Sequence, residues 1–394
     1  SQTIFLFSII LSIFIYFKDR HQLINLLIKI GKKPGRLVMI KPMIPQQLVH
    51  YTVPENADCL SIYANGPEEL KELLAQARDT AQDHTKAKAM DRLAKPIMNL
   101  LLTNPPPDSS FPTAFFSTKG FSGYTPLPFS VKGMQVFSNS FHIKPLLKWL
   151  QREHPFSLLL LGDKSATLFQ GTLTGIRGTE TLDYKELRTF DGVFSALDRA
   201  VYRTVQSTRT PLILAGNHDL IENYRNISGY RAILDESIVN DGSLSSIDNL
   251  HREAVRVLEP YLERREDQFI EKFRNAERNG MAAGSLQDVV HLALKGKVKL
   301  LLVSEAVHLW GYIDKINGTF SYRPGKRAGG EDDILDDLSE IVIRKHGNVA
   351  ILPSYRMPGG RVACAILRGM DPFWKERRGK NLEHEEMMEN RLAI

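Results

Sequence analysis

The segment Leu286–Ser304 reads LQDVVHLALKGKVKLLLVS and joins two kinds of local structure. Its first half predicts a short helix over Leu286–Lys295, closed by Gly296, because glycine adopts the left-handed conformation of a helix C-terminus without steric cost. Its second half predicts a buried strand over Lys299–Ser304, where apolar residues follow one another. A helix leading directly into a buried strand indicates an α/β layer structure.

The same alternation continues on both sides of this segment, over a unit that we place at residues 249–369. A long charged helix, broken or kinked near Pro260, is expected before it. A charged tail, 370–394, follows the unit. The other elements predicted for the unit are strands over Val307–Asp314, Asn348–Leu352 and Val362–Arg368 and a helix over Ile334–Lys345.

A second unit is expected over residues 153–248. FSLLLLG and ATLFQG are apolar runs joined by Asp163–Ser165, a pattern typical of a strand hairpin. The glycine- and threonine-rich stretch 171–190 predicts a protruding loop. A helix over Asp191–Gln206, the strand Pro211–Ala215 and a further helix complete the unit.

The first unit, residues 39–152, shows the same kind of alternation. It starts with a strand at Cys59–Tyr63, followed by a long helical stretch from Pro67 to about Leu102. Short apolar runs come next, and HIKPLLKWLQ at His142–Gln151 predicts a last helix. We therefore expect three α/β domains, the third a small three-layer α/β fold.

Composition excludes several classes of protein. Apolar residues make up 43% and charged residues 24% of the 394, as in ordinary globular proteins. The two cysteines, Cys59 and Cys364, form no C-x-x-C pair, which argues against a zinc ribbon and fits a reducing compartment. Residues 1–38 hold six basic residues and one aspartate, so they carry most of the net charge of +6. The basic pI is therefore no argument that the body binds nucleic acid.

The leader, residues 1–38, contains the apolar run Ile4–Phe17, which is shorter than the roughly 18 residues typical of a membrane span. We interpret the leader as a non-native extension, with Met39 as the natural start. If it is native and inserts, the basic residues on its C-terminal side leave the body in the cytoplasm. A cytoplasmic protein without membrane contact is expected otherwise.

Gly216–Asp219, GNHD, follows a predicted buried strand and is also a signature of calcineurin-like metallophosphoesterases, as is the Gly162-Asp163 pair before it. That chemistry needs two divalent ions about 3.5–4 Å apart, and hence a full ligand set. No D-x-H lies on a preceding strand and no G-H-x-H follows. We therefore expect no metal at His218, and expect Asn217 and Asp219 to cap the next helix.

The acidic run Gly329–Glu340, GGEDDILDDLSE, invites a cation site. The apolar residues from Ile334 to Val342 instead fall on one helical stripe, so Asp336 and Asp337 are expected to point to solvent. Glu331, Asp332 and Asp333 would then occupy the first turn, where negative charge complements the helix dipole.

No nucleophile elbow and no phosphate-cradling glycine motif occurs, so no catalytic residue and no cofactor is predicted. Basic residues in glycine-bearing loops suit phosphate contacts, although each is equally compatible with a solvated loop. The candidates for RNA contact are Arg177, Tyr184, Lys185, Arg188, Arg199, Arg203, Arg323, Lys326 and Arg327.

The ordered series of motifs resembles the archaeo-eukaryotic class-1 release factors and their relative Pelota, and more closely their bacterial homologues. The segments that carry the resemblance are SLLLLGDKSATLFQG (157–171), PLILAGNHDLIENYR (211–225), the opening segment and LSEIVIRKHGNVAILPSYRMPGGRVACAILRG (338–369). The resemblance covers roughly 155–369 well and 40–150 more loosely. It implies a release-factor- or Pelota-like arrangement of the three domains.

Two departures decide what the resemblance implies about activity. The family hydrolyses peptidyl-tRNA with a Gly-Gly-Gln tripeptide, which is absent here: Gly330 precedes Glu331, and Gly360 precedes Arg361. The NIKS motif that reads stop codons is also absent. The resemblance therefore implies ribosome binding without hydrolysis, as in Pelota and in the Balon-like hibernation branch, to which we assign the chain.

We accordingly expect a ribosome-binding factor, not an enzyme, that is monomeric off the ribosome and occupies the A site of idle or stalled ribosomes in hibernation or rescue. By resemblance, the first domain would lie toward the decoding centre (16S rRNA) and the central domain toward the peptidyl-transferase centre (23S rRNA). The third would contact an EF-Tu-like translational GTPase. The alternatives are a metallophosphoesterase and a release factor with chemistry other than Gly-Gly-Gln.

Overall fold

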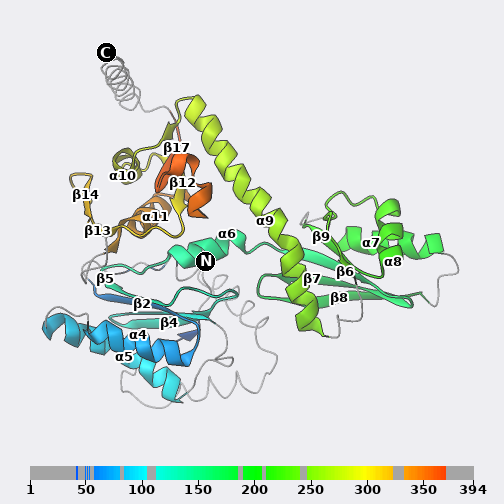
Figure 1. The fold of residues 1–394 in the computed structure, drawn as a ribbon, viewed down its shortest axis with the longest axis horizontal. Helices are drawn as coiled ribbons and strands as arrows, with labels where there is room; N and C mark the ends of the chain where they lie inside the picture. The colour runs from blue at the N-terminus through cyan, green and yellow to red at the C-terminus, as the bar shows by residue number, and fades with distance from the viewer. Residues whose placement is uncertain are drawn as a thin grey trace, which may run out of the picture. The chain divides into compact units, whose positions relative to one another are not determined.

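A computed structural model describes residues 41–42, 49, 51, 53, 57–79, 84–103, 112–184, 190–205, 210–239, 246–322 and 332–369. The leader 1–38 and the tail 370–394 lie outside these residues. Helices and strands alternate throughout the described part and form several sheets, so the expected α/β class is confirmed (Figure 1).

The C-terminal sheet has the strand order β11 (Ala282–Ala283), β17 (Ala363–Leu367), β12 (Val298–Ser304) and β16 (Asn348–Leu352). Leu301 and Val303 of β12 pack on the side of α10 (Leu286–Leu294) and α11 (Ile334–Arg344). Leu300 and Leu302 pack on the other side, against the end of α9 (Ile247–Arg278). This is the three-layer fold that the opening segment predicted.

The predicted end of α10 is confirmed in detail. Gly296 has φ +68°, and its N–H donates to the carbonyl of Ala293, while the N–H of Lys297 donates to that of Leu292. These bonds satisfy carbonyls that the helix leaves open, which is why glycine stands there.

A small second sheet belongs to the same part of the chain. It has the order β14 (Thr319–Tyr322), β13 (Trp310–Asp314) and β15 (Asp332–Asp333). The predicted strand over Val307–Asp314 is therefore shorter than expected, and it continues into a hairpin with β14.

The central sheet has the order β10 (Ile238–Val239), β9 (Leu212–Gly216), β6 (Phe156–Leu161), β7 (Ser165–Thr172) and β8 (Gly175–Asp183). The hairpin of β6 and β7 is confirmed. The protruding loop expected over 171–190 is wrong for most of its length, because eight of the nine residues of β8 pair with β7. The threonines that suggested a loop favour a strand once they have a neighbour, and a bulge opposite Leu168 and Phe169 absorbs the extra residue.

Helices cover both faces of the central sheet. α7 (Phe190–Val205) and α8 (His218–Ile227) pack on the face of Leu159, Leu212 and Leu214 (Figure 1). The first half of α9 packs on the face of Leu158 and Ile213.

The long helix α9 therefore serves two cores. Its residues from Leu250 to Leu262 pack on the central sheet, and Ile270 and Phe273 pack on the C-terminal sheet. The break expected near Pro260 does not occur, since the helix is continuous across it. The apolar packing on both sides of Pro260 outweighs the hydrogen bond that a proline cannot donate.

The first sheet has the order β1 (Lys41–Pro42), β4 (Phe121–Pro126), β3 (Thr113–Thr118), β2 (Cys59–Ala64) and β5 (Met134–Ser138). α4 (Pro67–Asp79) and α5 (His84–Thr103) cover the face of Leu60 and Ile62 (Figure 1). The helical stretch expected from Pro67 to about Leu102 is described as α4 and α5. One helix of that length would extend about 50 Å at 1.5 Å per residue, whereas two shorter helices can both pack on one sheet.

The other face of the first sheet shares a core with the C-terminal sheet. Cys59 and Tyr63 of β2 and Leu146 of α6 (Lys144–Arg152) belong to the same buried cluster as Val303 and Leu338. α6 thus contributes to a core that is built from both ends of the described chain. Among the helices in this part of the chain, none has the length and apolar character needed to cross a bilayer.

Candidate functional site

The GNHD turn starts α8. Gly216 ends β9 with φ +141°, and Asn217 is the N-cap, its Oδ1 accepting the N–H of Asp219 at 3.0 Å. The predicted cap by Asn217 is confirmed, and Asp219 lies in the first turn, where its charge faces the positive end of the helix dipole. Asp163 lies in the β6–β7 turn, closed by a bond from the Gly162 N–H to the Ser165 carbonyl.

The two motifs nevertheless come from neighbouring strand ends. β6 and β9 are parallel, and Leu161 pairs in register with Gly216. Within the described ranges, however, the group of His, Cys, Asp or Glu side chains close enough to hold one metal ion lies elsewhere, at His142, His308 and Asp333. In the GNHD turn the structure shows the cap of α8 by Asn217.

This geometry predicts the effect of removing the cap. Asn217→Ala is expected to lower the free energy of unfolding by about 1 kcal/mol, because the Asp219 N–H loses its acceptor. Asn217→Asp, which keeps an acceptor oxygen, should stay close to the wild type. Urea denaturation measures both. Adding Mn²⁺ should leave the melting temperature unchanged; a rise in the wild type that Asn217→Ala abolishes would show that the turn holds a metal.

The structure describes four of the nine residues predicted to contact RNA. Arg177 of β8 and Arg199 and Arg203 of α7 are exposed. Arg203 pairs with Glu180 of β8 at 3.0 Å, so part of its charge is already balanced. Burial and the nearby charge of Asp163 raise the pKa of Tyr184 to about 12. Lys185, Arg188, Arg323, Lys326 and Arg327 lie outside the described residues.

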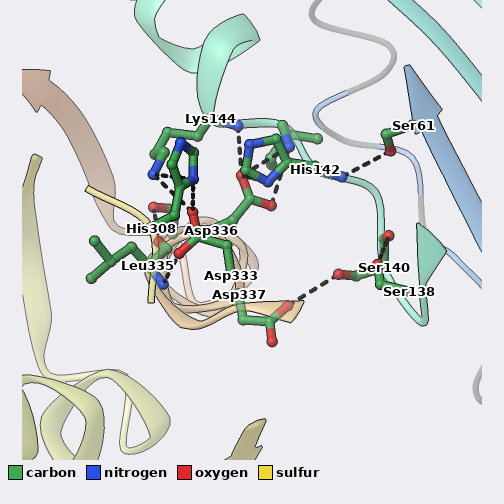
Figure 2. Close-up of polar contacts among 12 residues, drawn as sticks. Ser61, Ser138, Ser140, His142, Lys144, His308, Asp333, Leu335, Asp336 and Asp337 are labelled. Carbon is green, nitrogen blue, oxygen red and sulfur yellow. Dashed lines mark hydrogen bonds and ion pairs between the residues drawn. The ribbon is translucent and has the colours of Figure 1, made fainter. Parts of the chain in front are cut away.

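A buried polar cluster, which we call the α6–α11 cluster, was not anticipated from the sequence (Figure 2). The N-cap of α6, Ile143, offers no side-chain acceptor. Asp336 of α11 takes that role: its carboxylate accepts the N–H groups of Ile143, at 2.9 Å, and Lys144, at 2.6 Å. Ser140 donates its hydroxyl to Asp337 at 3.0 Å. Carboxylates about 190 residues away in sequence thus cap the helix.

A buried ion pair lies beside this cap. The ammonium of Lys144 is 2.8 Å from the carboxylate of Asp333, and the two side chains are 3% and 0% exposed. The same ammonium donates to the carbonyl of Val307. Asp333 also accepts the N–H of Leu335 as the N-cap of α11, and His308 lies 2.8 Å from it. One carboxylate therefore holds both the start of α11 and a lysine from α6.

Both histidines of the cluster lie against carboxylates and rings. His142 Nδ1 is 3.5 Å from Asp336, while the ring of His308 stacks on Trp310. His142, His308 and Asp333 could reach one cation between them. The Lys144 ammonium lies beside two of these three side chains, 3.4 Å from His308 Nδ1 and bonded to Asp333. It supplies the positive charge that a metal would bring.

The structure corrects the expectation for the acidic run. Asp336 is buried and Asp337 half-buried, whereas both were expected to point to solvent. Asp332 and Asp333 form β15 and precede the helix instead of occupying its first turn. The apolar stripe of α11 was found correctly, but α11 is covered on a second side, by residues 140–144. The two adjacent aspartates next to the apolar stripe are a sequence signal of that contact.

A second buried polar group holds the middle of α6. Lys148 donates to Glu266 of α9 at 3.0 Å and to the carbonyl of Ile351. Arg356, from the turn after β16, donates to the other oxygen of Glu266 at 3.0 Å. Glu266 thus ties α6, α9 and the C-terminal part of the chain together.

The comparisons with known proteins bear on the segment that runs from β8 to α10. Residues 174–297 match the family model of bacterial archaeo-eukaryotic release factor family 3. This segment is similar to the bacterial release-factor family. The resemblance expected from the sequence is therefore confirmed at this level, and its assignment to the Balon-like branch stays a prediction. No curated protein matches the chain at a significant level.

The solved structures that the chain matches are distant in sequence. A ribosome-bound archaeal Pelota with ABCE1 is 14% identical, with 86% of this chain and 98% of that chain covered and a TM-score of 0.40. Pelota of Archaeoglobus fulgidus is 16% identical, with 66% and 80% covered and a TM-score of 0.38. Dom34 of S. cerevisiae, whose description names it a translation termination-like factor interacting with Hbs1, is 14% identical, with 85% and 94% covered and a TM-score of 0.37.

Proposed function

We propose that the protein is a ribosome-associated translation factor of the cytoplasm that occupies the A site of idle or stalled ribosomes and does not hydrolyse peptidyl-tRNA. The observation that carries the proposal is the match of residues 174–297 to the bacterial release-factor family. The absence of Gly-Gly-Gln from the sequence supports binding without hydrolysis. Hibernation and rescue are both compatible with this proposal.

The placement of the parts follows the same proposal. Residues 39–152 would face the decoding centre and residues 153–248 the peptidyl-transferase centre, with residues 249–369 toward an EF-Tu-like GTPase. Arg177 and Arg199 support the central assignment, because both are exposed cations on the same sheet-and-helix unit. Such cations neutralise RNA phosphates and give a salt-dependent affinity.

Co-sedimentation with vacant ribosomes tests the proposal directly. The protein should pellet with ribosomes at about 100 mM salt, where contacts to several phosphates still hold. Arg177→Ala/Arg199→Ala should weaken binding several-fold and lower the slope of log affinity against log salt by about 2, one for each phosphate contact.

Arg274→Ala/Arg278→Ala is the matched control, since it removes two exposed arginines that pair with Glu271. It should leave the salt slope of ribosome binding unchanged. Absence of the wild type from the ribosomal pellet at this salt would overturn the proposal. Equal slopes for both double variants would remove Arg177 and Arg199 from the interface.

A further inference from the structure

The α6–α11 cluster holds more acid than base. Asp332, Asp333 and Asp336 are each at most 3% exposed, and Asp337 is half-buried beside them. The ammonium of Lys144 pairs with Asp333 among them. Asp333, Asp336 and Asp337 thus place three carboxylates around one lysine. Such an excess of buried negative charge is costly, so the site takes up protons when it forms.

The bonds of the cluster run in one direction across the contact. The donors Ser140 Oγ, the N–H groups of Ile143 and Lys144, and Lys144 Nζ come from the segment that ends the first sheet and begins α6. The acceptors Asp333, Asp336 and Asp337 come from β15 and α11. The excess negative charge therefore belongs to one side, and separating the two sides returns those carboxylates to water.

Every element packed here contributes a titratable or charged group. The His142 ring lies beside Asp336 and the His308 ring beside Asp333. Tyr63 of β2 donates its hydroxyl to the carbonyl of His142. On the side of the first sheet and α6, the groups that face the carboxylates are Cys59 and Tyr63 of β2, His142 before α6, and Lys144 of α6. On the other side they are His308 after β12, Asp332 and Asp333 of β15, and Glu340 of α11.

We propose that the α6–α11 cluster is a proton-operated latch: residues 140–152 dock onto α11 with uptake of protons, so that the contact tightens as pH falls and opens as pH rises. The opening is a local one, in which α6 loses its cap from Asp336 while the central sheet stays folded. This proposal does not depend on ribosome binding.

The titration of the carboxylates has the required sign. Burial, together with the charge of Asp333, raises the pKa of Asp336 well above its usual range, against the opposing effect of the two backbone N–H donors. Burial and the charge of Asp332 raise the pKa of Asp337 in the same way. A raised carboxyl pKa means that the docked form holds a proton which the open form releases, so docking is lost as pH rises through the raised pKa.

Asp333 works in the opposite direction, but only in strong acid. The hydrogen bond from His308 and the charge of Lys144 outweigh burial and hold the pKa of Asp333 well below its usual range. Its contribution to docking is therefore complete above the ordinary carboxyl pKa near 4 and is lost only below it. Between pH 6 and 8.5 the balance is set by the groups that take up protons.

Hydrogen–deuterium exchange of the full chain measures the opening. Exchange times are scaled for the intrinsic pH dependence of amide exchange, and peptides from α6 and α11 are compared with peptides from α7 and α8. One proton taken up on docking changes the opening constant tenfold per pH unit. We expect opening at α6 to increase at least about tenfold between pH 7 and 8.5, with α7 and α8 unchanged. Equal protection of α6 at all pH values, or a parallel change in α7 and α8, overturns the proposal.

Asp336→Asn/Asp337→Asn is the decisive variant. An amide oxygen can still accept from Ile143, Lys144 and Ser140, but the side chains no longer ionise, so the pH dependence at α6 should vanish. If this double variant does not fold, Asp337→Asn alone should lower the pH slope of opening at α6 by up to one proton. The amide does not ionise, and its oxygen can still accept from Ser140. Asp219→Asn, at an exposed position on α8, is the matched control and should keep the wild-type slope. A wild-type slope in the aspartate-to-asparagine variants of α11 overturns the proposal.

Discussion

Lys144→Ala is expected to lower the free energy of unfolding by about 3–5 kcal/mol, which is large for one side chain. The reason is the partner left behind: Asp333 is fully buried, and its closest cation is the ammonium 2.8 Å away. The carbonyl of Val307 would lose its donor as well. Burying an uncompensated charge costs more than the pair gains, so the loss should exceed that of an ordinary truncation of similar size.

Urea unfolding of three proteins tests this expectation. Lys71→Ala removes a lysine from an exposed pair with Glu68 and should change stability by about 0.5 kcal/mol or less. Lys144→Met/Asp333→Asn removes both charges while asparagine still caps α11 through the Leu335 N–H, so it should recover much of the loss. A loss below about 1 kcal/mol for Lys144→Ala would mean that Asp333 finds water or another cation.

Gly216→Ala is expected to have the second largest effect, about 3 kcal/mol or more. Gly216 has φ +141°, a conformation that side chains rarely adopt, and an added Cβ would lie 2.3 Å from the carbonyl oxygen of Leu161. That oxygen belongs to the backbone of the neighbouring strand, so it cannot move aside without disturbing the β6–β9 pairing. Backbone strain and overpacking each cost about 1–3 kcal/mol.

Gly175→Ala is the matched control, because Gly175 begins β8 in the same sheet and an added Cβ meets nothing within 4 Å. It should change the free energy of unfolding by well under 1 kcal/mol. The difference between the two variants, measured by urea unfolding, isolates the close approach at the β9–α8 turn. Equal effects would show that the turn relaxes freely around a methyl group.

Elements with local signals could be predicted from the sequence. Gly296 marks the end of α10 and Asn217 the start of α8, because capping depends on residues within one turn. The continuous apolar run of β12 correctly indicated a buried strand. β8 was missed because glycine and threonine favour a loop locally, and only the pairing with β7 turns the segment into a strand.

The α6–α11 cluster could not be predicted, because its partners are far apart in the sequence. Asp336 looks exposed when α11 is considered alone, since the apolar stripe already accounts for one face. Its actual neighbours, Ile143 and Lys144, come from the start of α6. The same limit applies to Arg203: its exposure could be expected, but its pairing with Glu180 could not.

The continuity of α9 has a consequence for where the protein can be cut or recombined. Its half from Leu250 to Leu262 is the cover of the central sheet, although it lies beyond residue 248, where the sequence suggests that the central domain ends. A fragment that stops there would leave the face of Leu158 and Ile213 uncovered and prone to association. The transplantable module is therefore the sheet together with at least the first turns of α9 through Leu262. Any graft at that point inherits the direction of the helix, and with it the orientation of whatever follows.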